Sequence, residues 1–154
     1  MADIFIVRHG HSPMTGPSDH QRSLSLEGRM AAHKTGQFIQ QQQLEDCICI
    51  CSDATRTQQT AEIICEIMGI KTCDAHHALY GATVGMWHEI MLAHPNKNQI
   101  LVGHNPTMSQ LYTQLTNQHK HFSPACVGHI RIEILQDGLT LPAENINFYN
   151  PDNH

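Results

Sequence analysis

The sequence predicts an α/β domain with a largely parallel central sheet. Short apolar runs rich in β-branched residues alternate with longer stretches of helical periodicity, as in a parallel sheet whose strands are joined by helices. The 154 residues suit one domain, and the 40% of them that are hydrophobic can form a buried core. Three of the apolar runs also end in polar residues that are typical of loops.

The N-terminal part of the chain predicts one strand, one loop and one helix. The run DIFIV is short, apolar and β-branched, so a buried strand is expected over residues 3–7. Gly and Pro recur in residues 13–23, which predicts a loop. Ser25 can then cap a helix over residues 26–42, where apolar residues fall at helical spacing.

The middle of the chain repeats this alternation. CICIC predicts a second buried strand over residues 47–51, with its three cysteines on one face. A helix is expected over residues 55–68, and Gly69 suits its C-cap. We expect a short strand over residues 70–73 and a loop over residues 74–82.

The C-terminal part predicts two helices and three strands. A helix over residues 83–93 precedes QILVG, a strong strand over residues 99–103. Proline can begin the next helix, over residues 106–117. Alternating HIRIEIL predicts a strand over residues 129–135, and residues 145–149 favour another. The last five residues are expected to be frayed.

Composition and charge narrow the classes of function. The formal charge of −5 disfavours a nucleic-acid partner, because such binding depends on Lys and Arg that neutralise phosphates. No run approaches the roughly 18 apolar residues of a membrane span. The N-terminus lacks the basic and apolar regions of a secretory signal. These features predict a cytoplasmic protein that binds neither nucleic acid nor membrane.

The cysteines and histidines are numerous, but their spacing does not predict a metal site. The six cysteines contain no CxxC pair, so we expect buried free thiols in a reducing cytosol. Four of the thirteen histidines lack acid or thiolate companions at ligand spacing and are expected on the surface: His76, His77, His119 and His121. The single tryptophan, Trp87, is expected in the core.

Polar residues follow three of the strong strands. Arg8 and His9 follow the first, Arg56 follows the second and His104 follows the third. The carboxyl ends of parallel strands share one edge of a sheet, so these side chains are expected to form one cationic pocket. Guanidinium groups match phosphate oxygens, and Arg22 could add a third guanidinium from its loop. The first amides of the helix after residue 54 could add an anion site.

His9 is the candidate nucleophile of this pocket. A neutral imidazole can attack phosphorus, and the adjacent Arg8 favours the neutral ring by repulsion. Gly10 lets the backbone pass close, so a carbonyl could hold the other ring nitrogen and fix the tautomer. Water could then hydrolyse phosphorylated His9, while His104 stabilises charge on the transferring group.

Four segments carry a resemblance to a known family. FIVRHGHS, SDATRTQQTAEII and LVGHNP resemble, in order, the three motifs of the histidine phosphatase (phosphoglycerate mutase-like) superfamily, and RSLSLEGRMAA resembles its first helix entry. The resemblance spans nearly the whole chain. It implies a single histidine phosphatase domain over residues 1–154, a three-layer α/β/α sandwich, and no metal or organic cofactor. It also implies that His9 accepts the phosphoryl group in a pocket made with Arg8, Arg56 and His104.

Within that superfamily, the compact length is similar to the SixA-type phosphohistidine phosphatases, in which Arg22 would match an extra pocket arginine. The proton donors of other branches are missing: no glutamate follows Leu79 directly, and Asn105 stands where an aspartate would follow the second histidine. Glu89 lies later, on an expected helix, and is not assigned. An imidazole leaving group, with a pKa near 6.5, needs less acid assistance than an alkoxide.

Three functions follow from this sequence. The first is a protein phosphohistidine phosphatase in signal transduction, whose partner would be a histidine phosphotransfer domain or a phosphotransferase carrier, as the resemblance suggests. The second is a small-molecule phosphomonoesterase that acts on a sugar or nucleotide phosphate. The third is a phosphate-binding module without catalysis. A mutase is disfavoured because it needs the missing acid and a closed site.

Overall fold

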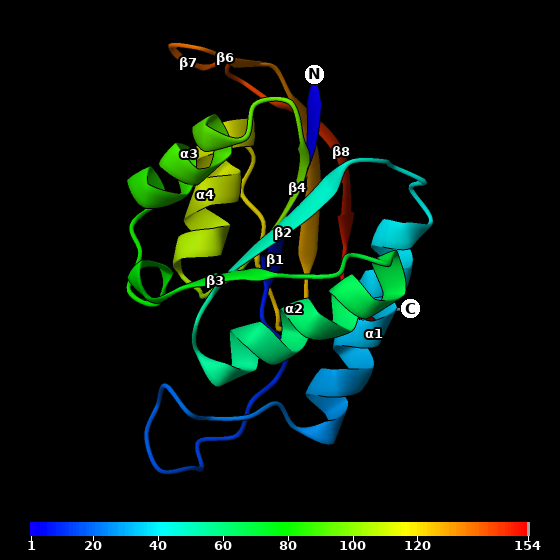
Figure 1. Cartoon of the computed structure of the whole chain (residues 1–154), viewed down its shortest axis with the longest axis vertical. Coiled ribbons are helices and arrows are strands. Elements are labelled where there is room, and N and C mark those ends of the chain that lie inside the picture. Colours follow the sequence, from blue (N-terminus) through cyan, green and yellow to red (C-terminus); the bar gives the residue numbers. More distant parts are fainter. Residues whose placement is uncertain (154) are drawn as a thin grey trace.

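A six-stranded sheet forms the centre of the computed structural model, which describes residues 1–153. Its strands lie in the order β3-β2-β4-β1-β5-β8 (Figure 1). Their bounds are β1 Ala2–Arg8, β2 Cys47–Ser52, β3 Asp74–His76, β4 Asn98–Gly103, β5 Val127–Ile132 and β8 Glu144–Tyr149.

The sheet is largely parallel, as predicted. Strands β3, β2, β4 and β1 run parallel to one another, whereas β5 pairs antiparallel with both β1 and β8. Arg8 pairs with Gly103 at the end of β1 and β4, and Cys51 pairs with Val102 on β2 and β4. The carboxyl ends of these three strands therefore lie side by side at one edge. The segment of residues 9–25, blue in Figure 1, lies beyond that edge.

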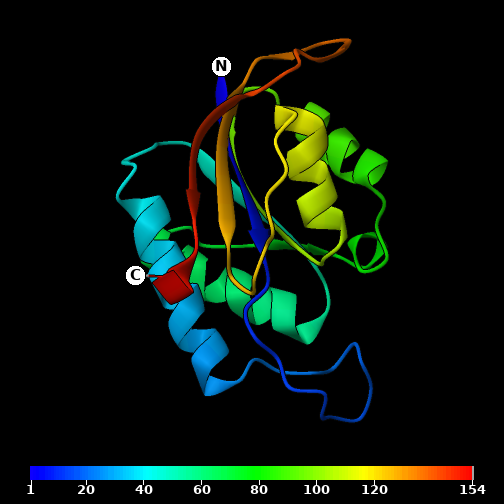
Figure 2. The ribbon, with the colours of Figure 1, turned by 180° about the vertical axis from the view of Figure 1, so that it is seen from behind.

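Four helices cover the sheet, two on each face (Figures 1 and 2). Their bounds are α1 Leu26–Gln40, α2 Thr55–Met68, α3 Val84–Ala93 and α4 Thr107–Thr116. Side chains of β1 alternate between two apolar clusters: Phe5 and Val7 pack with α1 and α2, whereas Ile4 and Ile6 pack with α3 and α4. The molecule is thus a three-layer α/β/α sandwich, in agreement with the sequence.

Local signals in the sequence explain where the helices begin and end. The Ser25 hydroxyl accepts a hydrogen bond from the Gly28 amide and caps α1 as predicted. The Thr83 hydroxyl caps α3 in the same way. Gly69 ends α2 in a left-handed conformation, with φ at +74°. No helix among residues 1–153 is both long and apolar enough to cross a membrane.

The third strand begins later than predicted. The prediction of a strand over residues 70–73 is wrong. The Ile70 amide instead donates a hydrogen bond to the Cys65 carbonyl and completes the end of α2. Strand β3 instead occupies Asp74–His76 and pairs with β2. The expected loop over residues 74–82 therefore holds this strand and a short 3₁₀ helix, η1 His77–Leu79.

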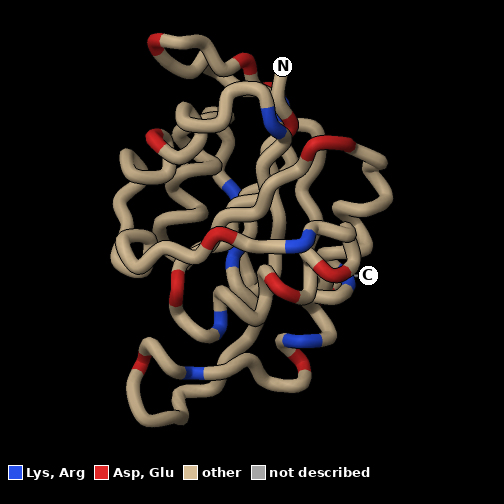
Figure 3. Tube along the Cα trace, in the orientation of Figure 1, with Lys and Arg blue, Asp and Glu red and all other residues tan. Residues whose placement is uncertain are grey.

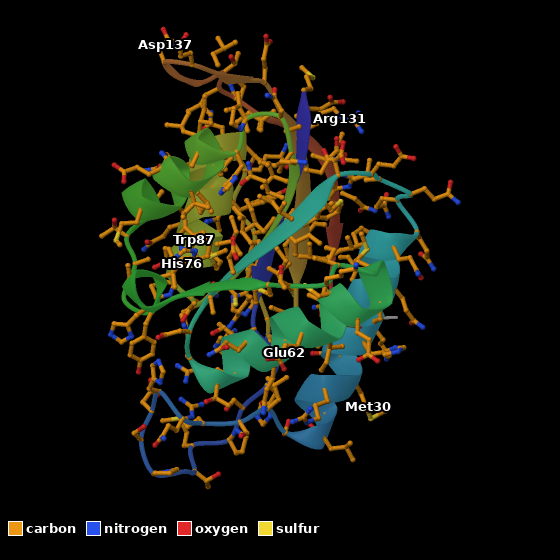
Figure 4. The ribbon with its side chains drawn as sticks, viewed as in Figure 1. Met30, Glu62, His76, Trp87, Arg131 and Asp137 are labelled. Carbon is orange, nitrogen blue, oxygen red and sulfur yellow. The ribbon has the colours of Figure 1, made fainter. Side chains whose placement is uncertain are left out.

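The C-terminal prediction also needs two corrections. The strand expected over residues 129–135 ends at Ile132, and the chain then forms a hairpin of β6 Ile134–Leu135 and β7 Gly138–Leu139. Gln136 and Asp137 form the two-residue turn between these strands (Asp137 in Figure 4), and Gly138 begins β7 with φ at +159°. The tail was expected to be frayed, but Pro151–Asn153 form a 3₁₀ turn, η2, in which Pro151 is buried. Residue 154 lies outside the described residues.

Candidate active site

The five residues predicted from the strand ends and the first loop line one cavity. It has a volume of about 470 Å³ and lies at the carboxyl edge of the sheet. Its lining consists of Arg8, His9, Met14, Asp19, Arg22, Arg56, Tyr80, His104 and Asn105. The rings of His9 and His104 lie 5.3 Å apart between centroids. A larger hollow of about 560 Å³ between α1 and α2 contains none of the predicted catalytic residues.

His9 is held in one tautomer at the end of β1. Its backbone amide bonds the Gly103 carbonyl, which ties it to β4. Its Nδ1 lies 2.7 Å from the Gly10 carbonyl oxygen. A carbonyl can only accept a hydrogen bond, so Nδ1 carries the proton and Nε2 keeps its lone pair. This matches the predicted use of a carbonyl to fix the ring.

Both pocket imidazoles are uncharged at neutral pH. Burial lowers the pKa of His9 to about 3; the hydrogen bond with the Gly10 carbonyl opposes this shift, and the nearby His104, Arg56 and Arg8 add to it. Burial and then Arg56 lower the pKa of His104 to about 4. Repulsion by Arg8 was predicted, but burial is the larger cause.

Two pocket guanidinium groups have buried N–H groups without a partner. Within residues 1–153, the Nε atoms of Arg8 and Arg56 are buried and make no hydrogen bond. Arg8 is anchored by a bond from its Nη1 to the Phe122 carbonyl at 2.8 Å. An unsatisfied buried donor is costly, so these groups favour a hydrogen-bond acceptor. A phosphate oxygen would satisfy them.

A carboxylate that the sequence did not reveal lies among the arginines. Asp19 accepts hydrogen bonds from Arg22 Nη1 at 2.8 Å and Arg56 Nη2 at 3.1 Å. The Tyr80 hydroxyl also donates to it. The hydrogen bond from Tyr80, followed by that from Arg22, lowers the pKa of Asp19 well below its usual range. Arg22 is held on the loop by bonds to the carbonyls of Ser12 and Pro13.

Ser52 and Tyr80 position His104, and neither was assigned from the sequence. The Ser52 hydroxyl lies 2.8 Å from His104 Nε2 and is buried at the end of β2. Tyr80 contacts the His104 ring edge-on, with centroids 5.6 Å apart. Ser52 opens the SDATR segment, so its place after a strand was a usable signal. Tyr80 carried no comparable signal, because it follows an irregular segment.

One predicted anion contact is absent and two side-chain clusters were missed. The Thr55 amide donates to the His20 carbonyl at 2.9 Å, so it is not available to a substrate.

His77 does have an acid companion, contrary to prediction: Asp53 lies 3.0 Å away and also contacts His20. Three cysteine sulfurs likewise lie within 4.8 Å of one another. They belong to Cys49, Cys65 and Cys73.

The cysteines agree with the prediction in another respect. All six are free thiols, of which Cys47 and Cys73 are half-buried and the others buried. Hydrogen bonds with Cys65 and Cys73, followed by burial, raise the pKa of Cys49. The bond with Cys49 opposes the shift of Cys65, but the bond with Cys73 and burial raise its pKa to about 12. These groups therefore remain protonated at neutral pH. Trp87 is buried against the sheet, as predicted (Figure 4).

Comparison with known proteins now identifies the family. The sequence model of the histidine phosphatase superfamily (branch 1) matches residues 4–90, more than half of the chain. The chain therefore belongs to the histidine phosphatase superfamily, a family of phosphatases. The matched part includes the first two predicted motifs and ends before His104. No curated protein sequence matches the chain significantly.

Solved structures share the whole fold. The protein histidine phosphatase SixA complexed with tungstate has a TM-score of 0.85 at 19% identity, over 98% of each chain. A phosphohistidine phosphatase SixA from Nakamurella multipartitia, described as putative, has a TM-score of 0.82 at 22% identity, over 97% of this chain and 96% of that one. A mycobacterial glucosyl-3-phosphoglycerate phosphatase has a TM-score of 0.73 at 15% identity, over 96% of this chain and 99% of that one.

Proposed function

We propose that this phosphatase removes the phosphoryl group of a phosphohistidine on a partner protein, through a phosphorylated His9. The observation that carries the proposal is the neutral His9 ring beside two unpaired buried guanidinium N–H groups. A nucleophile and donors for the transferred oxygens are thus present in one cavity. A histidine phosphotransfer domain or a phosphotransferase carrier would be the partner.

The reaction has two steps. His9 Nε2 attacks phosphorus, the bond between phosphorus and the substrate imidazole breaks, and the leaving nitrogen takes a proton from solvent. Water then attacks phospho-His9, loses a proton and releases inorganic phosphate, which restores the ring. Arg8 and Arg56 hold the phosphoryl oxygens in both steps. Ser52 binds Nε2 of His104, so the other nitrogen of that ring can face the phosphoryl group.

The absence of a suitable acid supports a P–N substrate. Among residues 1–153, the cavity lining contains one carboxylate, Asp19, whose hydrogen bonds keep it ionised. Asn105 cannot donate as an acid, and its amide already bonds the Phe122 carbonyl. A leaving imidazole is far less basic than an alkoxide, so it departs without strong acid assistance.

A small-molecule phosphomonoesterase is the second candidate. Its support is the fold similarity to glucosyl-3-phosphoglycerate phosphatase and a cavity large enough for a compact phosphate ester. The deciding experiment compares kcat/KM for a phosphohistidine protein with kcat/KM for a panel of sugar and nucleotide phosphates. We expect the protein substrate to be preferred and His9→Ala to be inactive on all of them.

Two results of that comparison would contradict the proposal. A metabolite turned over faster than every phosphohistidine protein would favour the second candidate. Tight binding of a phosphorylated partner without turnover would favour a binding module. We also propose a cytoplasmic location, because the six cysteines remain free thiols, as is usual in a reducing compartment.

A further inference from the structure

Three potential metal ligands meet at the rim of the phosphate cavity. His20 lies on the first loop, Asp53 follows β2 and His77 begins η1. His20 Nε2 lies 2.7 Å from one carboxylate oxygen of Asp53, and His77 Nδ1 lies 3.0 Å from the other. All three ligand atoms lie within 4.8 Å of one another. Three separate segments thus point their donors at one place.

The composition and exposure of this cluster suit a divalent transition metal. Two imidazoles and one carboxylate are ligands typical of Zn²⁺, and three protein ligands leave a fourth position for water. Their side chains are 34%, 25% and 79% exposed for His20, Asp53 and His77, so an ion can reach them from solvent. Each imidazole now shares a proton with the same carboxylate, and one ion could replace both shared protons.

The cluster is coupled to the phosphate cavity through the first loop. His20 follows Asp19, whose carboxylate and carbonyl both bind Arg56. The His20 ring also contacts Tyr80, whose hydroxyl donates to Asp19. While His20 stays beside Asp53, the adjacent Asp19 therefore stays hydrogen-bonded to Arg56, the guanidinium group that would bind a substrate phosphate. Substrate must displace that carboxylate, and a tether on His20 opposes the displacement.

We propose that His20, Asp53 and His77 bind a divalent transition-metal ion, with Zn²⁺ as the best match, and that the ion inhibits the enzyme. The bound ion joins the first loop to the ends of β2 and β3. Asp19 is then retained on Arg56 and competes with the phosphate. The inhibition rests on the proposed function, whereas the metal site does not.

The metal site is tested by calorimetric titration of the full chain with Zn²⁺ alone. Replacing one of three ligands, in His77→Ala, should weaken binding at least about tenfold. The matched control is His76→Ala, because His76 precedes His77, is exposed at the end of β3 and is not in the cluster (Figure 4). Equal affinities of the two variants would overturn the site.

Spectra of the Co²⁺-loaded chain separate this site from the thiols. We expect visible bands of a nitrogen and oxygen site, which disappear in His77→Ala and persist in His76→Ala. An intense near-ultraviolet thiolate band would place the ion on Cys49, Cys65 and Cys73 and would overturn the assignment.

The inhibition is tested by hydrolysis of a phosphohistidine protein at increasing free Zn²⁺. Wild type and His76→Ala should lose activity with an increase in KM, and His77→Ala should need at least about tenfold more Zn²⁺. Unchanged turnover at a Zn²⁺ concentration that saturates the calorimetric site would overturn the coupling. A chain inactive without Zn²⁺ would contradict the proposed function, while the titration would still decide the metal site.

Discussion

His9 is an uncharged ring in a pocket of positive charge. Burial and the neighbouring cations lower its pKa to about 3, and the Gly10 carbonyl fixes its proton on Nδ1. At neutral pH the ring therefore presents a lone pair on Nε2 without any general base. The cations that suppress protonation of His9 are the same groups that would hold the phosphoryl oxygens.

Removal of this ring should remove catalysis and leave the fold intact. His9→Ala should lower kcat/KM at least about 10³-fold, because the nucleophile has no substitute in the cavity. His119→Ala is the matched control, since His119 is exposed and outside the cavity. The activities are compared once thermal unfolding has shown that both variants unfold with the same midpoint. Residual activity of His9→Ala near the wild-type value would contradict the assignment.

The low pKa values of His9 and His104 also predict how stability depends on pH. Both rings titrate near 6.5 when unfolded and at about 3 and about 4 when folded. The unfolded chain therefore binds more protons below pH 6.5, and stability falls as the pH falls. Each ring contributes about 1.4 kcal/mol per pH unit within that window. Denaturant unfolding is measured at pH 7 and pH 5. Between these values, the free energy of unfolding should fall less for His9→Asn than for wild type. An equal fall would show that the His9 ring is not a source of the pH dependence.

Asp19 accepts hydrogen bonds from Arg22 and Arg56, two of the arginines proposed to bind the phosphate. Asp19→Asn removes the negative charge but keeps the size of the side chain, so inorganic phosphate should inhibit at a lower concentration. Ion pairs at half-exposed positions are worth about 0.2–1 kcal/mol each, so two of them predict roughly a two- to thirtyfold gain. Weaker phosphate inhibition in this variant would mean that Asp19 orients the arginines instead.

At the scale of elements, the end of β1 lies directly against the start of α1. A Cβ on Gly28 would overlap the His11 carbonyl oxygen, and one on Gly10 would lie 2.7 Å from the Gly28 carbonyl oxygen. The two backbones approach so closely that no side chain fits between them. This contact fixes the segment that carries His9, and the Gly10 amide is further held by the Thr60 hydroxyl on α2.

A methyl group between these elements should lower stability. Gly28→Ala should lower the free energy of unfolding by about 1–3 kcal/mol, despite the better helix propensity of alanine. Gly85→Ala on α3 is the control, because its Cβ has room, and it should gain up to about 1 kcal/mol. Chemical denaturation measures both. A Gly28→Ala variant as stable as Gly85→Ala would contradict the close packing.

Elements with strong local signals were predictable, and those fixed by pairing were not. The caps Ser25 and Gly69 and the apolar run of β2 act within a few residues, so the sequence located these elements closely. Strand β3 was misplaced because it is only three residues long and all three are exposed, with polar side chains at Asp74 and His76. Only the hydrogen bonds to β2 make them a strand, and no local pattern reports such bonds.

At the scale of the whole molecule, the order of the strands assembles the cavity. Residues 8, 56 and 104 are far apart in the chain, yet β1, β2 and β4 end side by side. The parallel topology therefore made the cationic cluster predictable from three strand ends. Lys and Arg are otherwise scattered among acidic residues along the trace (Figure 3), so the positive charge of the cavity is local.

The rest of the site depends on how the loops fold over that edge. Asp19 and Tyr80 lie 61 positions apart and meet through the first loop and η1, whose conformations no short motif encodes. The cluster of His20, Asp53 and His77 depends on the same meeting. The sequence could place each residue in its segment, but the contacts between irregular segments required the structure.

The most direct test of the central claim is to trap the phosphorylated enzyme. Wild type is mixed with a phosphohistidine protein, quenched within the first turnover under alkaline conditions and digested for mass spectrometry. We predict an acid-labile phosphoryl group on His9 in wild type and no phosphorylated peptide in His9→Ala. Rapid turnover by wild type with the phosphoryl group on another residue, or with none trapped at any time, would contradict the account.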